Sequence, residues 1–212
     1  MSKKFYLSVH DLNSLLPGLD DLLRLKKEYP SFKVTCFTIP SPNPDYCNGV
    51  LKHYSEFTKE EIKGWVDKIN KCDWIEVGIH GLYHLGHEAN CSYLDAKFLV
   101  ERAEKVFDKY GLKYKKIFAA PYWDYSSESL ELLRDKGYVV AIRREIRQAP
   151  EGLKVHMHKW EFNRELPEGD IVFGNGHLNS VRCKDSIEKC YNNILKSIPK
   201  DSNFGFISEL YE

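Results

Sequence analysis

The sequence predicts an α/β fold built around a parallel sheet, and three observations indicate it. Short apolar segments rich in β-branched and aromatic residues alternate with longer segments whose apolar residues recur at helical spacing. Strands that alternate with helices are typical of a parallel sheet, either closed into a barrel or wound with helices on both faces. The chain holds about eight strand-like segments, a count that favours the barrel.

Eight segments predict strands, because each is a short apolar run bounded by turn-forming or polar residues. In chain order they span residues 4–10, 33–40, 73–80, 116–121, 138–144, 153–160, 170–177 and 204–208. A loop rich in proline and asparagine, PSPNPDYCNG, follows the second of them. The fifth, sixth and seventh strands have no long helix between them, which predicts a barrel that is irregular on that side.

Five segments predict helices between these strands. In chain order they span residues 19–30, 58–71, 92–110, 126–137 and 184–197. Leucines recur through the first helix, which Pro30 ends. Thr58 can cap the second helix, and Glu61 three residues later completes a capping box. Gly111 follows the third helix at the position where a left-handed residue commonly ends one.

Length and composition predict one globular domain, residues 1–212. Lys plus Arg and Asp plus Glu both total 31, so the formal net charge is zero and nothing indicates a nucleic-acid partner. Aromatic residues make up 13% of the chain, which excludes a disordered protein. The sequence contains no run of about 18 apolar residues, so it predicts no membrane-spanning helix. The sequence leaves the oligomeric state open.

The cysteines and the N-terminus bear on the compartment. None of the six cysteines forms a C-x-x-C pair, so a zinc ribbon or a thioredoxin-like motif is unsupported. The N-terminal MSKKFYLSVHDLN predicts a strand and lacks the apolar core of a signal peptide. We therefore expect a cytoplasmic protein with reduced thiols.

Residues able to bind ligands follow four of the predicted strands. The strand ends supply, in chain order, His10 and Asp11, then His80 and His84, then Tyr122, Trp123 and Asp124, and finally Asn175 and His177. Active sites in such folds lie at the C-terminal ends of the strands, so these side chains should gather on one rim. This convergence predicts the active site.

Asp11, His80 and His84 form a set of one carboxylate and two imidazoles. The H-x-x-x-H spacing predicts both imidazoles on one face of a helical turn. Three protein ligands leave a fourth position for water, as a catalytic zinc requires, and such an ion lowers the pKa of that water. We expect one divalent metal ion, with zinc as the first expectation and nickel, cobalt or manganese compatible with the same ligands.

The remaining histidines have simpler interpretations. His53 and His87 are expected on surface loops, although His87 follows His84 closely enough to replace it as a ligand. His156 and His158 alternate on a strand and face the same way, so this H-x-H pair is an alternative chelator.

Four of these motifs, in this order, resemble those of the polysaccharide deacetylase superfamily, the NodB-homology enzymes of carbohydrate esterase family 4. SVHDLN resembles the first motif, EVGIHGLYH with its Glu76 and Gly78 the second, FAAPYWDYS the third and DIVFGNGHLN the last. The similarity runs from residue 5 to about 180, and is greatest to an uncharacterised branch whose first motif reads His-Asp. The resemblance implies a distorted (β/α) barrel of seven to eight mostly parallel strands.

The resemblance also implies an activity: metal-dependent hydrolysis of an N-acetyl (or O-acetyl) group on a saccharide or sugar-containing precursor. It implies Asp11 as a metal ligand, the backbone N–H of Tyr122 as an oxyanion-hole donor, and His177 as the general acid that protonates the leaving amine. Three further strand-end residues are the expected substrate contacts: Trp123, Asp124 and Asn175.

Two positions depart from the family pattern. His10 stands where the catalytic base is usually an Asp, and Ala119 stands where an Arg usually tethers that Asp. The two changes are coherent, because without the Asp the Arg has nothing to hold. His10 could act as the base, as a ligand or as an orienting group. The motif that supplies a carboxylate to the acid histidine is not recognisable in residues 143–160, which leaves Asp124 as the candidate.

Three alternatives to the deacetylase remain open. The chain could be a catalytically silent, sugar-binding member of the same fold. It could be a metal-dependent amidohydrolase acting on a small non-polysaccharide substrate, with His156 and His158 recruited. It could also be a purely structural α/β domain, which would bind no metal. Without a secretion signal, a nucleotide- or lipid-linked amino sugar is favoured over an extracellular polymer.

Overall fold

The computed structural model describes residues 3–13, 19–42, 58–177 and 184–212 of the chain. The strands are β1 (Lys4–Leu12), β2 (Val34–Thr38), β3 (Ile75–Ile79), β4 (Ile117–Ala119), β5 (Val139–Ile142), β6 (Lys154–Met157), β7 (Trp160–Glu161), β8 (Ile171–Gly176) and β9 (Asn203–Gly205). The helices are α1 (Leu19–Glu28), α2 (Lys59–Asn70), α3 (Tyr93–Tyr110), α4 (Ser127–Asp135) and α5 (Lys184–Ser197), with short 3₁₀ turns η3 (Pro121–Trp123) and η4 (Ile207–Leu210).

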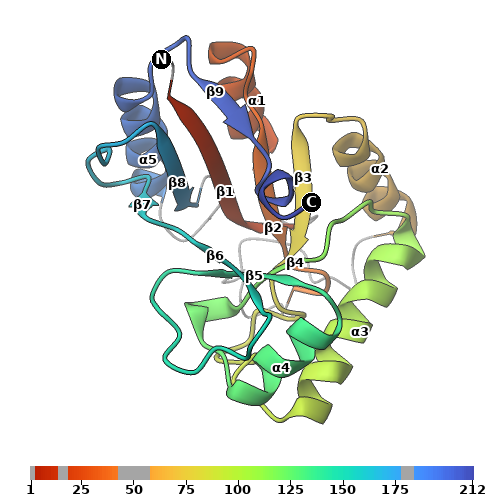
Figure 1. The fold of residues 1–212 in the computed structure, drawn as a ribbon. Helices are drawn as coiled ribbons and strands as arrows, with labels where there is room; N and C mark the ends of the chain where they lie inside the picture. Colours follow the sequence, from red (N-terminus) through yellow and green to blue (C-terminus); the bar gives the residue numbers. More distant parts are fainter. Residues whose placement is uncertain (1–2, 14–18, 43–57, 178–183) are drawn as a thin grey trace.

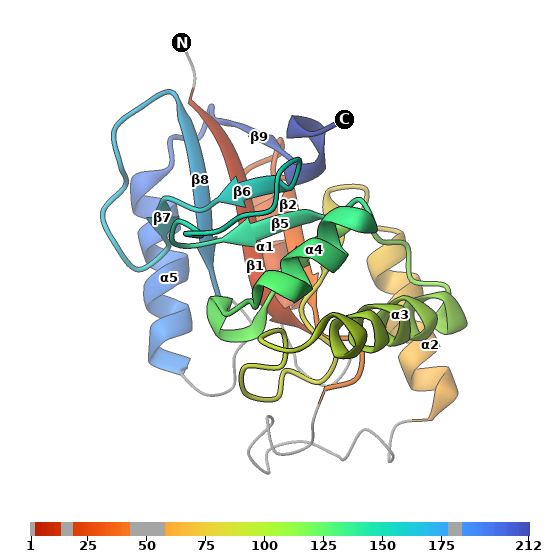
Figure 2. The same ribbon diagram turned by 60° about the horizontal axis from the view of Figure 1, so that its bottom comes forward.

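The strands form one nine-stranded sheet in which every described pairing is parallel. Their order in space is β6-β5-β4-β3-β2-β1-β8-β7, and β9 pairs with the first half of β1 (Figure 1). The sheet curls, so that β5 and β6 come round in front of β1 and β8 (Figure 2). The predicted fold class, a distorted (β/α) barrel, is confirmed.

The predicted helix ends are confirmed at α2 and α3. The hydroxyl of Thr58 accepts the N–H of Glu61 at 3.1 Å, and the carboxylate of Glu61 accepts the N–H of Thr58 at 2.8 Å. Gly111 ends α3 in the left-handed conformation, with φ of 72°. Local sequence signals therefore define these boundaries.

The segment 153–160, predicted as one strand, forms two strands that lie at opposite ends of the sheet. The N–H of His158 donates to the carbonyl of Ile142 on β5, at 2.9 Å. The next N–H, of Lys159, donates to the carbonyl of Phe173 on β8, also at 2.9 Å. Because consecutive donors bond to strands at opposite ends of the sheet, this link joins the two ends of the curled sheet.

Side chains of the sheet alternate between two environments, as expected for a curled parallel sheet. One set packs outward against the helices in the main core. The other set faces the barrel interior, where it forms a second cluster with Ile207 of η4: Phe37, Ile117, Ala119, Val139 and Ala141. The predicted last strand, 204–208, thus ends at Gly205, because the chain turns into the barrel interior there.

Two further observations concern the helices and the cysteines. None of the described helices combines the length and apolar character that a membrane crossing requires. The four cysteines among the described residues, Cys36, Cys72, Cys91 and Cys190, are free thiols.

The packing of η4 predicts the effect of truncating its central side chain. Ile207 is fully buried, so Ile207→Ala should leave a cavity and lower the free energy of unfolding by about 2–5 kcal/mol. Leu94→Ala is the control, because Leu94 on α3 is 75% exposed and its truncation should cost less than about 0.5 kcal/mol. Urea denaturation measures both, and equal midpoints would show that η4 does not stabilise the barrel.

Candidate metal and active site

An irregularity at the end of β1 provides the first two site residues. Val9 pairs with Cys36 and Leu12 pairs with Thr38, so His10 and Asp11 together lie opposite Phe37 alone. This is a β-bulge, and Asp11 within it has a left-handed φ of 65°. In a regular strand the two side chains would point to opposite faces. The bulge instead leaves both buried and both close to His80.

The loop after β3 provides the two predicted histidine ligands, and its conformation differs from the predicted helical turn. Gly81 and His84 adopt left-handed φ values of 61° and 55°, and no helix forms between His80 and His84. The side chain of Glu88 explains the shape of the loop. Its carboxylate accepts three consecutive backbone N–H groups, at 3.0, 3.1 and 2.9 Å, from Leu82, Tyr83 and His84. A Cβ at Gly81 would lie 1.9 Å from Glu88 Oε1, so this position requires glycine.

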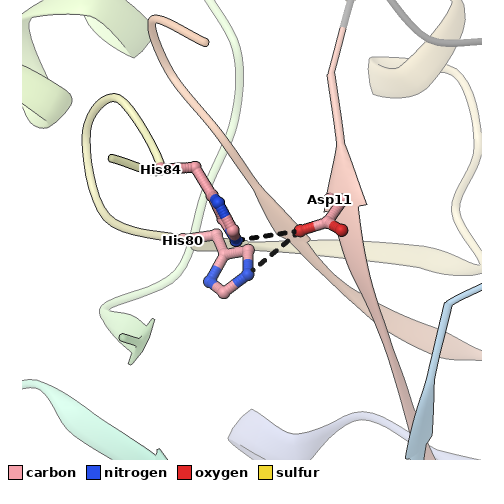
Figure 3. A group of neighbouring side chains, drawn as sticks. All are labelled: Asp11, His80 and His84. Atoms are coloured by element: carbon pink, nitrogen blue, oxygen red, sulfur yellow. Dashed lines mark ion pairs between the residues drawn. The ribbon is translucent and has the colours of Figure 1, made fainter. Parts of the chain in front are cut away.

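The structure brings the three predicted metal ligands together (Figure 3). Oδ1 of Asp11 lies 3.2 Å from Nε2 of His80 and 3.4 Å from Nε2 of His84. Ligand atoms at the corners of a tetrahedron, each about 2.0–2.2 Å from a zinc ion, are about 3.3–3.6 Å apart. One carboxylate oxygen and two imidazole nitrogens at these spacings therefore fit a single divalent ion.

The orientation and charge of the imidazoles also fit a metal. Nδ1 of His80 donates to the carbonyl of Ala119 at 2.8 Å, which orients the ring so that Nε2 faces Asp11. Burial, reinforced by His80, lowers the pKa of His84 to about 4. His84 is therefore neutral at pH 7, in the form that binds metal ions.

Asp11 is the most enclosed charge of the site. Burial alone would raise its pKa, but a hydrogen bond from His80 and the nearby His177 and His84 lower the pKa of this carboxyl well below its usual range. Nε2 of His177 lies 3.4 Å from Oδ2 of Asp11, whereas His80 and His84 lie beside Oδ1. The carboxylate is thus ionised and flanked by three imidazoles.

His10 occupies the inner wall of the site. It is 1% exposed, and its ring lies 4.7 Å from the Trp123 ring and 4.9 Å from the His80 ring. Its Nε2 has no hydrogen-bond partner among the described residues. Burial and then the neighbouring histidines, His80 first, hold the pKa of His10 well below its ordinary value. A neutral imidazole with a free ring nitrogen can accept a proton or a hydrogen bond.

The turn after β4 provides the opposite wall. Tyr122 and Trp123 have left-handed φ values of 57° and 61°, and the ring of Tyr122 lies 5.8 Å from that of His84. The hydroxyl of Tyr125 fastens this turn, because it accepts the N–H of Ala120 at 2.8 Å and donates to the carbonyl of Ala141 at 2.7 Å.

Asp124 lies on the outer side of that wall. Its Oδ2 accepts from Nδ1 of His87 and from Nδ2 of Asn90, both at 2.9 Å. His87 therefore pairs with Asp124, and it is absent from the group of possible metal ligands among the described residues. A cavity of about 550 Å³ opens beside this pair, lined by His87, by residues 122–125 and by residues 142–147.

Four predicted residues remain: Asn175, His156, His158 and His53. Asn175 is buried, and its amide donates to the carbonyl of Trp160 at 3.1 Å, so it joins β7 to β8; its role as a substrate contact stays a prediction. His156 and His158 face the barrel interior, and within the described residues they do not form a second metal-binding group. His53 lies outside the described residues.

Glu88 and Tyr125 are the residues that sequence reasoning missed. Glu88 shapes the ligand loop through backbone N–H groups, and Tyr125 fastens the η3 turn through backbone atoms. Neither contact belongs to a local pattern. The one available signal was Gly81, whose close approach to another group is a common reason for a glycine in a loop.

The fold and the site define a parallel α/β barrel with a carboxylate and two imidazoles at its strand ends. No family model matches the chain, and neither does any curated protein. Solved structures do match. A peptidoglycan N-acetylglucosamine deacetylase in complex with a naphthalenyl N-oxidanyl-benzamide aligns over 98% of this chain and 87% of that one, with TM-score 0.63 and 11% identity.

Two further structures show the same fold. A family 4 acetyl xylan esterase from Clostridium thermocellum, in complex with a cobalt ion, aligns over 99% of this chain and 90% of that one, with TM-score 0.58 and 14% identity. A family 4 pseudoenzyme from Bacillus anthracis aligns over 100% of this chain and 66% of that one, with TM-score 0.59 and 15% identity. The chain therefore has the fold of the family 4 carbohydrate esterases, as its motifs predicted.

The ligand set predicts how metal content depends on single residues. The wild type should purify with, or take up, about one equivalent of divalent metal, and His84→Ala or Asp11→Ala should lose most of it because each removes a ligand. His87→Ala is the matched control, since this histidine pairs with Asp124 instead. Elemental mass spectrometry measures all four proteins. Equal loss in the control, or no metal in the wild type after zinc addition, would contradict the assignment.

The buried histidines predict a stability that falls in acid. Burial lowers the pKa of His156 from 6.5 to about 4, so between these pH values the unfolded chain takes up a proton that the folded chain does not. Stability is therefore lost as pH falls from about 6.5 to 4, by up to about 3 kcal/mol for this group. Urea unfolding of chelator-treated protein should show a shallower pH dependence in His156→Gln. An unchanged slope would mean that His156 is charged or solvated in the fold.

Proposed function

We propose that the protein is a metal-dependent deacetylase that hydrolyses an N-acetyl (or O-acetyl) group of a saccharide or sugar-containing precursor, with residues 1–212 as one catalytic domain. One observation carries the proposal. Asp11, His80 and His84 gather at the strand ends of a fold shared with family 4 carbohydrate esterases, and His177 lies on the other oxygen of Asp11. The solved structures add that one such esterase holds a cobalt ion.

The site supplies the groups that amide or ester hydrolysis needs. Asp11, His80 and His84 would hold a divalent ion, which would supply a water of lowered pKa and polarise the acyl carbonyl. Neutral His84 and ionised Asp11 are the forms that hold such an ion at pH 7. Zinc is our first choice, and cobalt, nickel and manganese suit the same donors.

His177 is the proposed general acid. Removal of about half of the ring from water lowers the pKa of His177, while the carboxylate of Asp11 acts in the opposite direction. Nε2 of His177 faces Asp11, and its side chain is 52% exposed, so the ring can reach both the centre and an entering substrate. A histidine in this position can protonate the leaving amine as the carbon–nitrogen bond breaks.

The opposite wall provides the remaining roles. The N–H of Tyr122 belongs to the η3 turn, whose left-handed backbone Tyr125 fastens, and we assign it to the oxyanion of the reacting acyl group. His10 holds a free ring nitrogen beside the ligands and is our candidate base. We expect Trp123 to contact the substrate, because its ring packs on His10 and also lines the cavity.

A catalytically silent, sugar-binding protein is the second candidate, and one observation favours it. Ala119 and His10 replace the Arg and Asp of the family pattern, and one protein of the same fold is described as a pseudoenzyme. Normal metal content without acetate release from any acetylated saccharide would support this reading. The free thiols among the described residues agree with the cytoplasmic location that we propose for either candidate.

The acid assignment predicts a separation of metal binding from turnover. His177→Ala should keep the metal, because the ligand set is intact, and should lower kcat by about 10²–10⁴-fold on any substrate the wild type deacetylates. Acetate release from a panel of N- and O-acetylated saccharides is the assay, with elemental analysis beside it. Full turnover in this variant would refute the proposed role of His177.

The base assignment predicts a parallel result at the inner wall. His10→Gln keeps a hydrogen-bonding side chain of similar size but cannot accept a proton, so kcat should fall about 10²-fold or more while metal content stays normal. A variant that loses its metal would make His10 a ligand. A variant with unchanged kcat would leave the base role to another group.

A further inference from the structure

We propose that the cavity beside the metal set binds the phosphate group of a phosphorylated acetyl sugar, with Arg144 and Arg147 as its anion-binding side chains. The acetyl sugar rests on the proposed function. The inference of a phosphate group rests on separate observations: the position of the cavity, the charged side chains that line it, and the ion pairs that some of those side chains already form.

The cavity lies directly beside the candidate reaction centre. β4 and β5 are neighbours in the sheet, with Ala119 paired to Ala141, so the segments that follow them rise side by side from the same rim. These segments, residues 122–125 and 142–147, form the walls of the cavity of about 550 Å³. Trp123 belongs to both places, because its ring also lies 4.7 Å from the His10 ring. A sugar whose acyl group reaches the metal set can therefore extend its other end into the cavity.

Guanidinium groups are concentrated on one wall of this cavity. Arg143, Arg144 and Arg147 fall within five residues, in a chain whose formal net charge is zero. Arg143 already has a carboxylate partner, Glu161, which also fixes the loop to β7. Arg144 and Arg147 are exposed and take part in none of the ion pairs found among the described residues.

The carboxylates of the cavity leave these two arginines available. Asp124 is occupied on the opposite wall by His87 and Asn90. Glu145 is exposed, and it stands between two arginines in sequence without an ion pair in the described structure. The guanidinium groups of Arg144 and Arg147 therefore line the cavity without an ion-pair partner among the described residues, and Glu145 is the one carboxylate of the lining that is not already paired.

An anionic ligand explains this arrangement better than a neutral saccharide does. A neutral sugar would displace water from the two guanidiniums without providing acceptors of matching charge, which is unfavourable. The planar guanidinium fork matches two oxygens of a phosphate, and such charge-assisted hydrogen bonds are among the stronger polar contacts. The cavity volume is within the range that accommodates a sugar with its phosphate.

The first experiment measures anion binding without the reaction. Pyrophosphate is titrated by calorimetry into chelator-treated protein at low salt, so that it cannot bind to a metal ion. The wild type should bind it, and the double variant Arg144→Gln/Arg147→Gln should bind at least about tenfold more weakly, because two charged donors are lost. The matched control is Arg102→Gln/Lys105→Gln, which removes two exposed positive charges from α3, away from the cavity, and should bind like the wild type.

Two results of this titration would overturn the inference. The first is no pyrophosphate binding by the wild type up to millimolar concentration. The second is an equal loss in the double variant and in the α3 control, which would indicate a general effect of net charge and not a built site.

The second experiment connects the cavity to turnover. Acetate release is compared for N-acetylglucosamine, its 1-phosphate, a nucleoside diphosphate sugar and a lipid pyrophosphate sugar in detergent. At least one phosphorylated form should exceed the free sugar about tenfold in kcat/KM, and the double variant should lose that advantage while the free sugar is unaffected. The form with the highest kcat/KM identifies the source of the phosphate.

The two proposals fail in different ways. Arginine-dependent pyrophosphate binding without acetate release from any substrate would remove the deacetylase function and keep the anion site. Acetate release that is equal for free and phosphorylated sugars, in wild type and double variant alike, would keep the function and remove the anion site.

Discussion

The buried carboxylate of Asp11 is the interaction on which the rest of the site depends. An ionised carboxylate removed from water is costly by several kcal/mol unless other groups compensate for the lost hydration. Three imidazoles do so here, His80 and His84 on one oxygen and His177 on the other, at 3.2–3.4 Å. The same arrangement suits Asp11 to the metal-ligand role that we propose for it, because a divalent ion would replace the missing hydration more completely than imidazoles can.

Backbone strain is concentrated around this carboxylate. Within the described residues, the non-glycine positions with positive φ are Asp11, His84, Tyr122 and Trp123. They belong to three segments of the site: Asp11 to the bulge that directs it inward, His84 to the loop after β3, and Tyr122 and Trp123 to the η3 turn. Such conformations cost about 1–3 kcal/mol each and persist only where the surroundings enforce them. Glu88 and Tyr125 provide that enforcement through hydrogen bonds to the backbone.

The sequence predicted which residues meet, but not how they are held. Asp11, His80 and His84 were predictable because each follows a strand, and the ends of parallel strands share one rim. The bulge, the left-handed loop and the roles of Glu88 and Tyr125 were not, because each depends on contacts between segments and not on local periodicity. The splitting of segment 153–160 into two strands has the same cause. The side-chain alternation continues through His158, but the backbone of His158 bonds to Ile142 of β5 and the backbone of Lys159 bonds to Phe173 of β8.

The two departures from the family pattern can now be understood as one electrostatic change. Position 119 is fully buried in the barrel interior, among Phe37, Val139 and Ile207, and a guanidinium there would need a carboxylate partner. In the family pattern an Asp at position 10 provides that carboxylate. Here position 10 is His10, whose lowered pKa keeps the side chain neutral. A neutral His10 beside an apolar Ala119 leaves no buried charge unpaired. An Asp at position 10 alone, or an Arg at position 119 alone, would leave one buried charge without its partner. The pair therefore adds no second buried charge beside the ionised Asp11.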